Sequence, residues 1–455
     1  MTQKCFRYAA TSLLSMVIGL TTTSAAAADP GVTDAKIVLG SVTPVSGPPS
    51  LLGKAHMLAL RVWEQDVNAR GGINGRKVEI RQEDDGYVPQ RAVQGVKRLV
   101  DVEGIFGLIG TSGSAMLQAM LPYINEQGLP TINAMAVAAA HFTPPNKTVF
   151  VIGPTYCQEL SSAMKNMVAS KKLQKEKFAL VYQDDEFGSD VRCGYQKAIK
   201  DLGLNSVSEI SFKRGTKDFS AEMLSLKQVG ATFLASGGVV AEHSMLMKEA
   251  AKNQMSLTFL AVHSAHLTPV QALAGAAGDG YFVADYVPPL TDLSVPGMAK
   301  FMGLAQKYLS ADELKSLNRY SITAYVGALL MEDAIRRCGK ALTRACVVEK
   351  LETTKNFNTD GLASPISFGP NDRHSPSSVL VLRSDAKNSR FERVSEPIPV
   401  LDGHQTPSVA RRTTGSARVS KSSDRQPWRD RAADPAHTQG HGARHRGGPP
   451  RGGRR

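Results

Sequence analysis

Two serines occupy the position in this sequence that best suits binding chemistry. Ser112 and Ser114 follow the apolar stretch Ile105–Ile109 and lead into a helical pattern at Ala115–Gln127. The free backbone N–H groups at a helix start and the two hydroxyls would converge on an anion such as a carboxylate. Capping of the helix by either serine explains the same pattern. Both interpretations place these serines at the start of a helix.

Sequence patterns of two enzyme classes are incomplete. The segment Gly110–Ser114 is close to a nucleophile elbow, but Ser114 stands where that pattern needs glycine. The segment Gly47–Lys54 has one residue too many between its glycines for a phosphate loop, and Ala55 replaces the required hydroxyl. Neither pattern therefore predicts a catalytic site.

Metal and acid–base patterns are also incomplete. His263 and His266 have the spacing of metal ligands, but no cysteine or carboxylate accompanies them locally. The acidic clusters Asp84-Asp85 and Asp184–Glu186 follow apolar stretches and are expected to order loops or line a surface between lobes. We predict no metal, no cofactor and no catalytic residue. An exported hydrolase using Ser114 and His263 is the enzyme alternative, and the sequence contains no ordered triad for it.

Strand and helix patterns alternate along most of the chain. The first unit runs from the strand Lys36–Ser41 through the turn Thr43–Pro48 into a helix that Gly71-Gly72 ends. The clearest later strands are Ile105–Ile109, Thr148–Ile152, Phe178–Tyr182, Ala231–Ser236 and Leu257–Val262, and a long helix is expected at Ser321–Arg337. This alternation predicts an α/β fold with parallel sheets covered by helices on both faces.

The first 28 residues have the composition of a secretory signal. Lys4 and Arg7 precede the apolar run Leu13–Leu20, and Ala25–Ala28 follows it. The apolar run is well short of the roughly 20 residues of a membrane-spanning helix. We therefore expect export, with cleavage near Ala28.

The positive charge is concentrated at the carboxyl end. Residues 401–455 contribute +8 of the net charge of +13, and their one aromatic residue is Trp428. Such a composition predicts a disordered basic tail. The end of the tail, Arg446–Arg455, is similar to arginine–glycine segments that bind RNA, but export argues against a nucleic-acid partner. A dispensable extension is the simpler interpretation.

Four cysteines follow the signal. Cys338 and Cys346 flank a short connection between two helical patterns, and we predict a disulfide there because an exported protein can oxidise its thiols. Cys157 and Cys193 fall at the starts of two successive predicted helices, where a disulfide and buried thiols are both consistent with the sequence.

Together, several blocks of sequence resemble the leucine/isoleucine/valine-binding family of periplasmic substrate-binding proteins of ABC importers. The blocks are Ser46–Pro48 with Gly53, Asn68–Arg76, Asp84-Asp85, Gly110–Ser112 and Gln183–Gly188, in that order along the chain. The resemblance covers about residues 35–395. It implies a type I periplasmic binding protein fold, with two doubly wound parallel-sheet lobes and a three-segment hinge that crosses near residues 150, 282 and 357. Lobe 1 would comprise residues 29–150 and 283–356, and lobe 2 would comprise residues 151–282 and 357–400.

The resemblance also implies which residues hold a ligand. The ligand would lie in the cleft between the lobes, with its carboxylate on the serine at the place of Ser114 and on groups near Met135–Val137. The full set of expected ligand-binding residues is Ser46, Ser112, Ser114, Met135, Ala136, Tyr156, Phe187, Val239 and His263.

Two of these positions depart from the family pattern. Val137 stands at the place of a family threonine, and His263 stands at the place of the carboxylate that pairs with a ligand ammonium. An imidazole cannot replace that anion, because an unpaired buried charge costs several kcal/mol. We therefore expect a small carboxylate or amide, with Phe187 over its apolar part.

The resemblance implies a partner and a location as well. It implies hinge closure on the small-molecule ligand, a periplasmic location, and recognition of a monomeric closed form by an ABC permease in the inner membrane. A sensory ligand-binding protein of the same fold is the alternative function.

Overall fold

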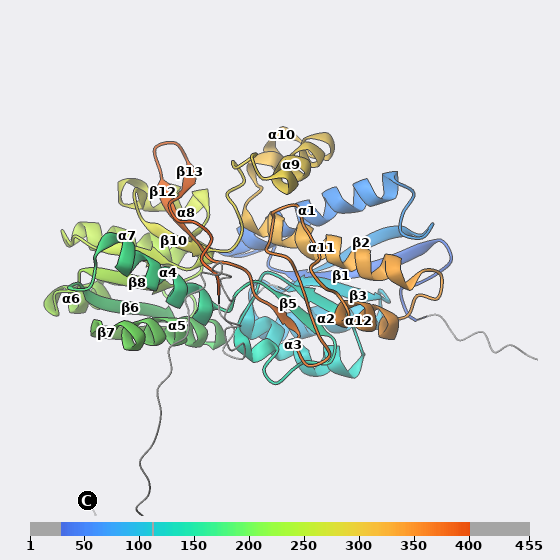
Figure 1. Ribbon diagram of the computed structural model, residues 1–455, viewed down its shortest axis with the longest axis horizontal. Coiled ribbons are helices and arrows are strands. Elements are labelled where there is room, and N and C mark those ends of the chain that lie inside the picture. Colours follow the sequence, from blue (N-terminus) through green and yellow to red (C-terminus); the bar gives the residue numbers. More distant parts are fainter. Residues whose placement is uncertain (1–28, 112, 401–455) are drawn as a thin grey trace, which may run out of the picture. The chain divides into compact units, whose positions relative to one another are not determined.

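The computed structural model describes residues 29–111 and 113–400. Their strands form two separate sheets, and the elements of each sheet form one group in Figure 1. The expected α/β class with parallel-dominated sheets is confirmed. The predicted signal at residues 1–28 and the predicted tail at residues 401–455 lie outside the described residues.

The first sheet has six strands in the order β11-β5-β4-β3-β1-β2, and all its pairs are parallel. Its strands are β1 (Lys36–Thr43), β2 (Lys77–Asp84), β3 (Gly107–Thr111), β4 (Thr131–Asn133), β5 (Val149–Ile152) and β11 (His374–Ser375). All residues of β3, β4 and β5 are buried, as expected for central parallel strands that are covered on both faces.

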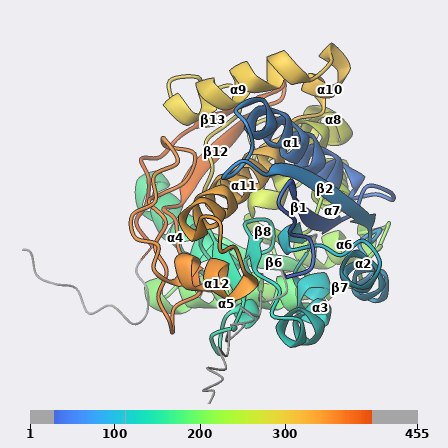
Figure 2. The same ribbon diagram turned by 90° about the vertical axis from the view of Figure 1, so that its right-hand side faces the viewer.

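The helices of this first group come from two parts of the chain. Some follow strands of the first sheet, and the others follow β10 of the second sheet. They are α1 (Ser50–Ala69), α2 (Pro89–Asp101), α3 (Ser114–Glu126), the 3-10 turn η1 (Ala139–His141), α9 (Pro296–Tyr308), α10 (Ala311–Lys315), α11 (Arg319–Cys338) and α12 (Arg344–Glu352). Helices α1 and α11 lie side by side (Figure 2). Gly53 in α1 allows close approach to the turn after β1, because a Cβ there would lie 2.1 Å from the Pro44 carbonyl oxygen.

The second sheet has seven strands in the order β13-β12-β10-β9-β8-β6-β7. These are β6 (Lys177–Gln183), β7 (Asn205–Phe212), β8 (Phe233–Gly237), β9 (Thr258–Ala261), β10 (Phe282–Asp285), β12 (Leu380–Asp385) and β13 (Arg390–Arg393). Pairing is parallel from β7 to β10, whereas β12 pairs antiparallel with both β10 and β13. The last hairpin thus adds an antiparallel edge to an otherwise parallel sheet.

The helices of the second group connect these strands. They are α4 (Tyr156–Lys171), α5 (Glu186–Leu202), α6 (Ser220–Gln228), α7 (Ala241–Lys252), η2 (His263–Ala265), α8 (Thr268–Ala274) and η3 (Gly275–Gly278). The two disulfides join Cys157 with Cys193, which links α4 to α5, and Cys338 with Cys346, which links α11 to α12.

The chain changes sheet three times. The first change follows β5 and the second follows β10, near the expected positions 150 and 282. The third lies between Ser375 and Leu380, later than the expected position near residue 357, because His374–Ser375 still pair with β5 of the first sheet. The first sheet therefore takes residues that the sequence analysis assigns to lobe 2.

Candidate functional site

The first wall of the candidate site is the start of α3. Ser114 is 1% exposed, and its Oγ is enclosed without a hydrogen-bond partner in the described part of the chain. The N-cap residue of α3 is Gly113, which has no side chain with which to cap the helix. A helix start that its N-cap residue leaves uncapped therefore coincides with a hydroxyl that has no partner among the described residues, an arrangement suited to an anionic ligand.

The loop after β4 is fixed beside this helix start. Asn133 Nδ2 donates to the Ala136 carbonyl (2.9 Å) and its Oδ1 accepts from Met135 N (3.1 Å). His141 Nε2 donates to the Ser114 carbonyl at 3.1 Å. Burial lowers the pKa of His141 to about 4, so its imidazole is neutral near pH 7. Ser114, Met135 and Ala136 thus belong to one hydrogen-bonded surface.

The second wall consists of aromatic and apolar side chains from the second group of elements. The Tyr156 ring stacks on His263 at a centroid distance of 5.0 Å and meets the edge of Phe187 at 4.7 Å. Phe187 lies in the first turn of the helix after β6, Val239 follows β8, and His263 follows β9. These strand ends form the edge at which open α/β sheets bind ligands.

Local caps set the positions of Tyr156 and Phe187. Thr155 and Gln158 form a capping box at the start of α4, and Asp185 Oδ1 accepts from Gly188 N at the start of α5 (3.2 Å). Such caps satisfy N–H groups that a helix start leaves without partners. They hold the first turns, and hence both aromatic rings, in place.

The carboxyl group of Glu159 lies beside the aromatic wall, and His263 binds both of its oxygens. Its Oε2 lies 2.7 Å from His263 Nδ1, and its Oε1 accepts from His263 N at 2.7 Å. Both side chains are almost completely buried. Burial raises the pKa of Glu159, while the charge and hydrogen bonds of His263 act in the opposite direction. Both Glu159 oxygens are therefore engaged by His263, and Glu159 holds the His263 ring in position.

A second buried ion pair lies where the chain leaves β10. Asp285 accepts from Arg319 Nε at 2.8 Å and lies 2.6 Å from His266 Nδ1. Burial alone would raise the pKa of Asp285, but the Arg319 charge and the His266 bond hold it below the usual range. The guanidinium lies over the rings of Tyr286 and Tyr320, 4.8 Å from each centroid.

Several contacts join the two groups of elements around the site. Tyr286 Oη donates to the Ala134 carbonyl at 2.8 Å, while the Tyr286 ring contacts the His263 ring at 5.3 Å. Arg214 follows β7 and donates to the Tyr87 carbonyl at 3.2 Å, and its Nη2 pairs with Asp185 at 2.7 Å. The strand ends of both sheets therefore face one another across these residues.

The expected site residues do not all share this environment. Ser114, Met135, Ala136, Tyr156, Phe187, Val239 and His263 are buried along the two walls. Ser46 is exposed, and its hydroxyl donates to Asp84. Ser112 lies outside the described residues. Sequence reasoning missed Glu159, Arg214, Tyr286, Arg319 and Tyr320. The cap residue Asn318 marks the helix start that presents Arg319 and Tyr320, but no local pattern reveals their partners.

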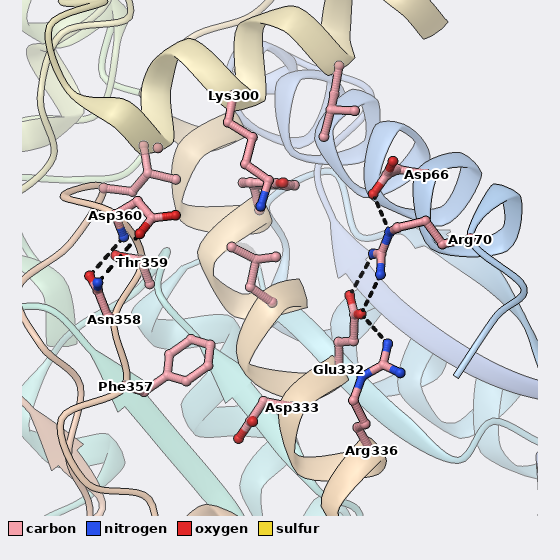
Figure 3. A pocket seen from close by; sticks show the side chains of 15 residues that line it. Asp66, Arg70, Lys300, Glu332, Asp333, Arg336, Phe357, Asn358, Thr359 and Asp360 are labelled. Atoms are coloured by element: carbon pink, nitrogen blue, oxygen red, sulfur yellow. Dashed lines mark hydrogen bonds and ion pairs between the residues drawn. The ribbon is translucent and has the colours of Figure 1, made fainter. Parts of the chain in front are cut away.

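A separate pocket of about 400 Å³ lies between α1, α9, α11 and the loop at residues 357–362. Figure 3 shows Arg70 and Arg336 converging on Glu332, with Nη–Oε distances of 3.1 and 2.6 Å, while Arg70 also pairs with Asp66. No described residue of the expected site lines this pocket. Its paired charges are consistent with a role in helix packing.

The described residues contain no group of three or more His, Cys, Asp or Glu side chains that could hold a metal ion. Within residues 29–111 and 113–400, no helix is both long enough and apolar enough to cross a membrane.

Solved structures share the fold. A substrate-binding protein of a fatty acid ABC transporter from Thermomonospora curvata is 24% identical, with a TM-score of 0.69 over 82% of this chain and 97% of that one. A branched-chain amino acid ABC transporter protein from Thermus thermophilus with bound valine is 21% identical, with a TM-score of 0.71 over 80% and 96%. A solute-binding protein from R. palustris in complex with 4-hydroxybenzoate is 20% identical, with a TM-score of 0.71 over 80% and 98%.

Sequence comparison gives the family. The Leu/Ile/Val-binding protein homolog 7 of Brucella suis biovar 1 is 26% identical over 329 residues, covering 70% of this chain and 81% of that protein. A family model described as periplasmic binding protein matches residues 36–389. The expected resemblance is confirmed: this chain belongs to the periplasmic binding proteins, a family of solute-binding proteins rather than enzymes, and has their type I fold.

Proposed function

We propose that this protein is the extracytoplasmic receptor of an ABC importer and that it binds a small carboxylate or amide between its two lobes. Closure about the three chain crossings would enclose the ligand, and a membrane permease would recognise the closed form. The proposed ligand-binding residues are those of the two buried walls. Ser114 would bind the ligand carboxylate, and Phe187 would pack over the apolar part of the ligand. No cofactor is required.

The observation that carries this proposal is the hydroxyl of Ser114, which has no hydrogen-bond partner among the described residues. A buried hydroxyl without a partner costs about 1–3 kcal/mol, and this one stands at a helix start that no side chain of the N-cap residue Gly113 caps. A ligand carboxylate would satisfy both the hydroxyl and the N–H groups. Related proteins with bound valine and 4-hydroxybenzoate, both of which carry a carboxylate, support this ligand class.

The periplasmic location and the monomeric state remain parts of this proposal. The family supports a periplasmic protein, and the signal expected at residues 1–28 would deliver it there with cleavage near Ala28. A sensory protein of the same fold would close on its ligand in the same way. The hydrolase alternative has less support, because Ser114 Oγ makes no hydrogen bond to His263 in the described part of the chain.

The test is a thermal-shift screen of the full chain against amino acids, aliphatic and aromatic carboxylates, and amides. A ligand that binds only the folded state raises the melting temperature. We expect shifts with carboxylates, and we expect Ser114→Ala to weaken their binding about tenfold. Because Ser114 Oγ has no partner among the described residues, the variant should keep the melting temperature of the free protein.

Ser220→Ala is the matched control, since Ser220 begins α6 in the second group of elements. It should leave binding unchanged. Carboxylate binding that survives Ser114→Ala at full strength would contradict the role of this hydroxyl, and a panel without any carboxylate shift would contradict the ligand class.

A further inference from the structure

The two ring nitrogens of His263 differ in their surroundings. Nδ1 is taken by Glu159, whereas Nε2 has no hydrogen-bond partner in the described part of the chain. The unpaired Nδ1 atoms of His56 and His141 are fully enclosed, but His263 Nε2 keeps accessible surface. The rings of Tyr156, Tyr286 and Tyr320 surround the imidazole. Nε2 is thus a polar atom surrounded by aromatic rings.

The protonation of the His263–Glu159 pair determines whether His263 Nε2 is a hydrogen-bond donor or an acceptor. A buried pair is costly unless its net charge is zero. A neutral pair is either a carboxylate with an imidazolium or a carboxylic acid with a neutral imidazole. In the first state both ring nitrogens carry protons, and in the second the acid donates to Nδ1, which leaves the ring proton on Nε2. In both neutral states Nε2–H is a donor.

Among the described residues, the two buried carboxyl groups nearest the His263 ring already have partners for both of their oxygens. Glu159 is 0% exposed, and both its oxygens bind His263. Both oxygens of Asp285 bind Arg319, and one of them also lies by His266. Glu242, after Val239, accepts from two backbone N–H groups with its Oε2. An ammonium placed at the His263 ring would face a donor and would lose its hydration without gaining an anion there.

We propose that His263 Nε2–H selects ligands that carry a second oxygen acceptor, so that the solute is an oxo acid or a comparable oxygen-bearing carboxylate and not an α-amino acid. This inference rests on the proposed function, because it names the solute of the same site. Glu159 is a positioning residue, which orients the ring and keeps the proton on Nε2. The acceptor oxygen and the imidazole form one hydrogen bond across the closed site.

The test uses two sets of ligands that differ at a single position. One set is 4-methyl-2-oxopentanoate, 4-methylpentanoate and L-leucine, and the other is phenylpyruvate, 3-phenylpropanoate and L-phenylalanine. We expect the full chain, in titration calorimetry, to bind the oxo acid of the better-fitting skeleton about 10- to 100-fold more tightly than the analogue without the oxygen. The amino acid should bind more weakly than either.

Two variants separate the imidazole donor from folding effects. Glu159→Gln removes the buried charge but can still accept from His263 N and donate to Nδ1, so Nε2 stays a donor and the preference for the oxo acid should persist. Glu159→Gln combined with His263→Phe keeps a flat ring without a donor. In this double variant the oxo acid and its deoxy analogue should bind within about threefold of each other.

The outcomes are distinguishable. Equal binding of the oxo acid and the deoxy analogue by the unmodified chain, or tighter binding of the amino acid, would overturn the inference and leave carboxylate binding intact. An oxo-acid preference that survives in the double variant would also overturn it, because the preference would then have another source. Failure of all six compounds to bind would instead remove the proposed carboxylate receptor itself.

Discussion

The buried polar side chains of Glu159 and Ser114 differ in their hydrogen bonding. Glu159 has a partner for each oxygen, whereas the Ser114 hydroxyl has none in the described residues. Native proteins pair nearly all such groups. An unpaired buried hydroxyl beside a helix start is therefore the kind of residue at which a missing ligand is expected.

Asp190 adds a titration near neutral pH to this region. Its carboxylate accepts from Cys157 N at 3.2 Å, and burial raises its pKa to about 7. In the unfolded chain an aspartate loses its proton near pH 4. The folded protein therefore holds more protons between about pH 4 and pH 7, so this residue lowers the free energy of unfolding as the pH rises through that window.

Asp190→Asn should remove that pH dependence. We expect the melting temperature of the variant, relative to the unmodified chain, to rise steadily from about pH 4 to pH 7 and to stay level above it. Scanning calorimetry at matched ionic strength measures the difference. A difference that stays constant between pH 4 and pH 8 would show that Asp190 titrates normally in the folded protein.

At the scale of elements, α5 depends on a close contact with the strand before it. A Cβ on Gly188 would lie 1.6 Å from the Gln183 carbonyl oxygen, at the point where β6 ends and α5 begins. Only glycine permits this approach, and the approach places Phe187 on the second wall. The helix start cannot accept a side chain here without moving.

Gly188→Ala should therefore destabilise the protein by at least about 2 kcal/mol and weaken ligand binding. Gly303→Ala is the matched control, because nothing lies within 4 Å of its added Cβ in α9. That change should stabilise the helix by about 0.5–1 kcal/mol. Denaturant unfolding compares the two, and a similar effect of both substitutions would argue against the contact.

The sequence predicts these elements well and their long-range pairing poorly. The strand predicted at Phe178–Tyr182 is Lys177–Gln183 in the structure, because a run of apolar residues between turns defines it locally. The two-residue strand His374–Ser375 has no such pattern. Ser114 could be found from its place before a helix. Glu159 could not, because its partner His263 lies 104 residues away.

At the scale of the whole described chain, Arg214 forms hydrogen bonds to both groups of elements, and we call this pair of contacts the latch. It joins the second group through Asp185 and the first through the Tyr87 carbonyl, and its Cζ lies 5.0 Å from the Tyr87 ring centroid. Contacts made only on closure add to the free energy of ligand binding. The latch should therefore contribute to affinity without touching the ligand.

Arg214→Met should lower ligand affinity about 10- to 100-fold, since a hydrogen bond to a charged group contributes about 1.5–3 kcal/mol. Arg192→Met is the control, because Arg192 pairs with Glu209 inside the second group. It should leave affinity unchanged. Calorimetric titration measures both, and equal losses in the two variants would show that Arg214 has no special role in closure.

The placement of the aromatic residues has a spectroscopic consequence. Tyr87, Tyr156, Tyr286 and Tyr320 are buried around the site, whereas Trp63, the one tryptophan among the described residues, is buried in α1 and donates to Glu332. The emission of Trp63 should therefore stay constant when a solute binds. Ultraviolet difference absorption of the tyrosines should instead follow closure directly, and the protein would need no attached dye to report it.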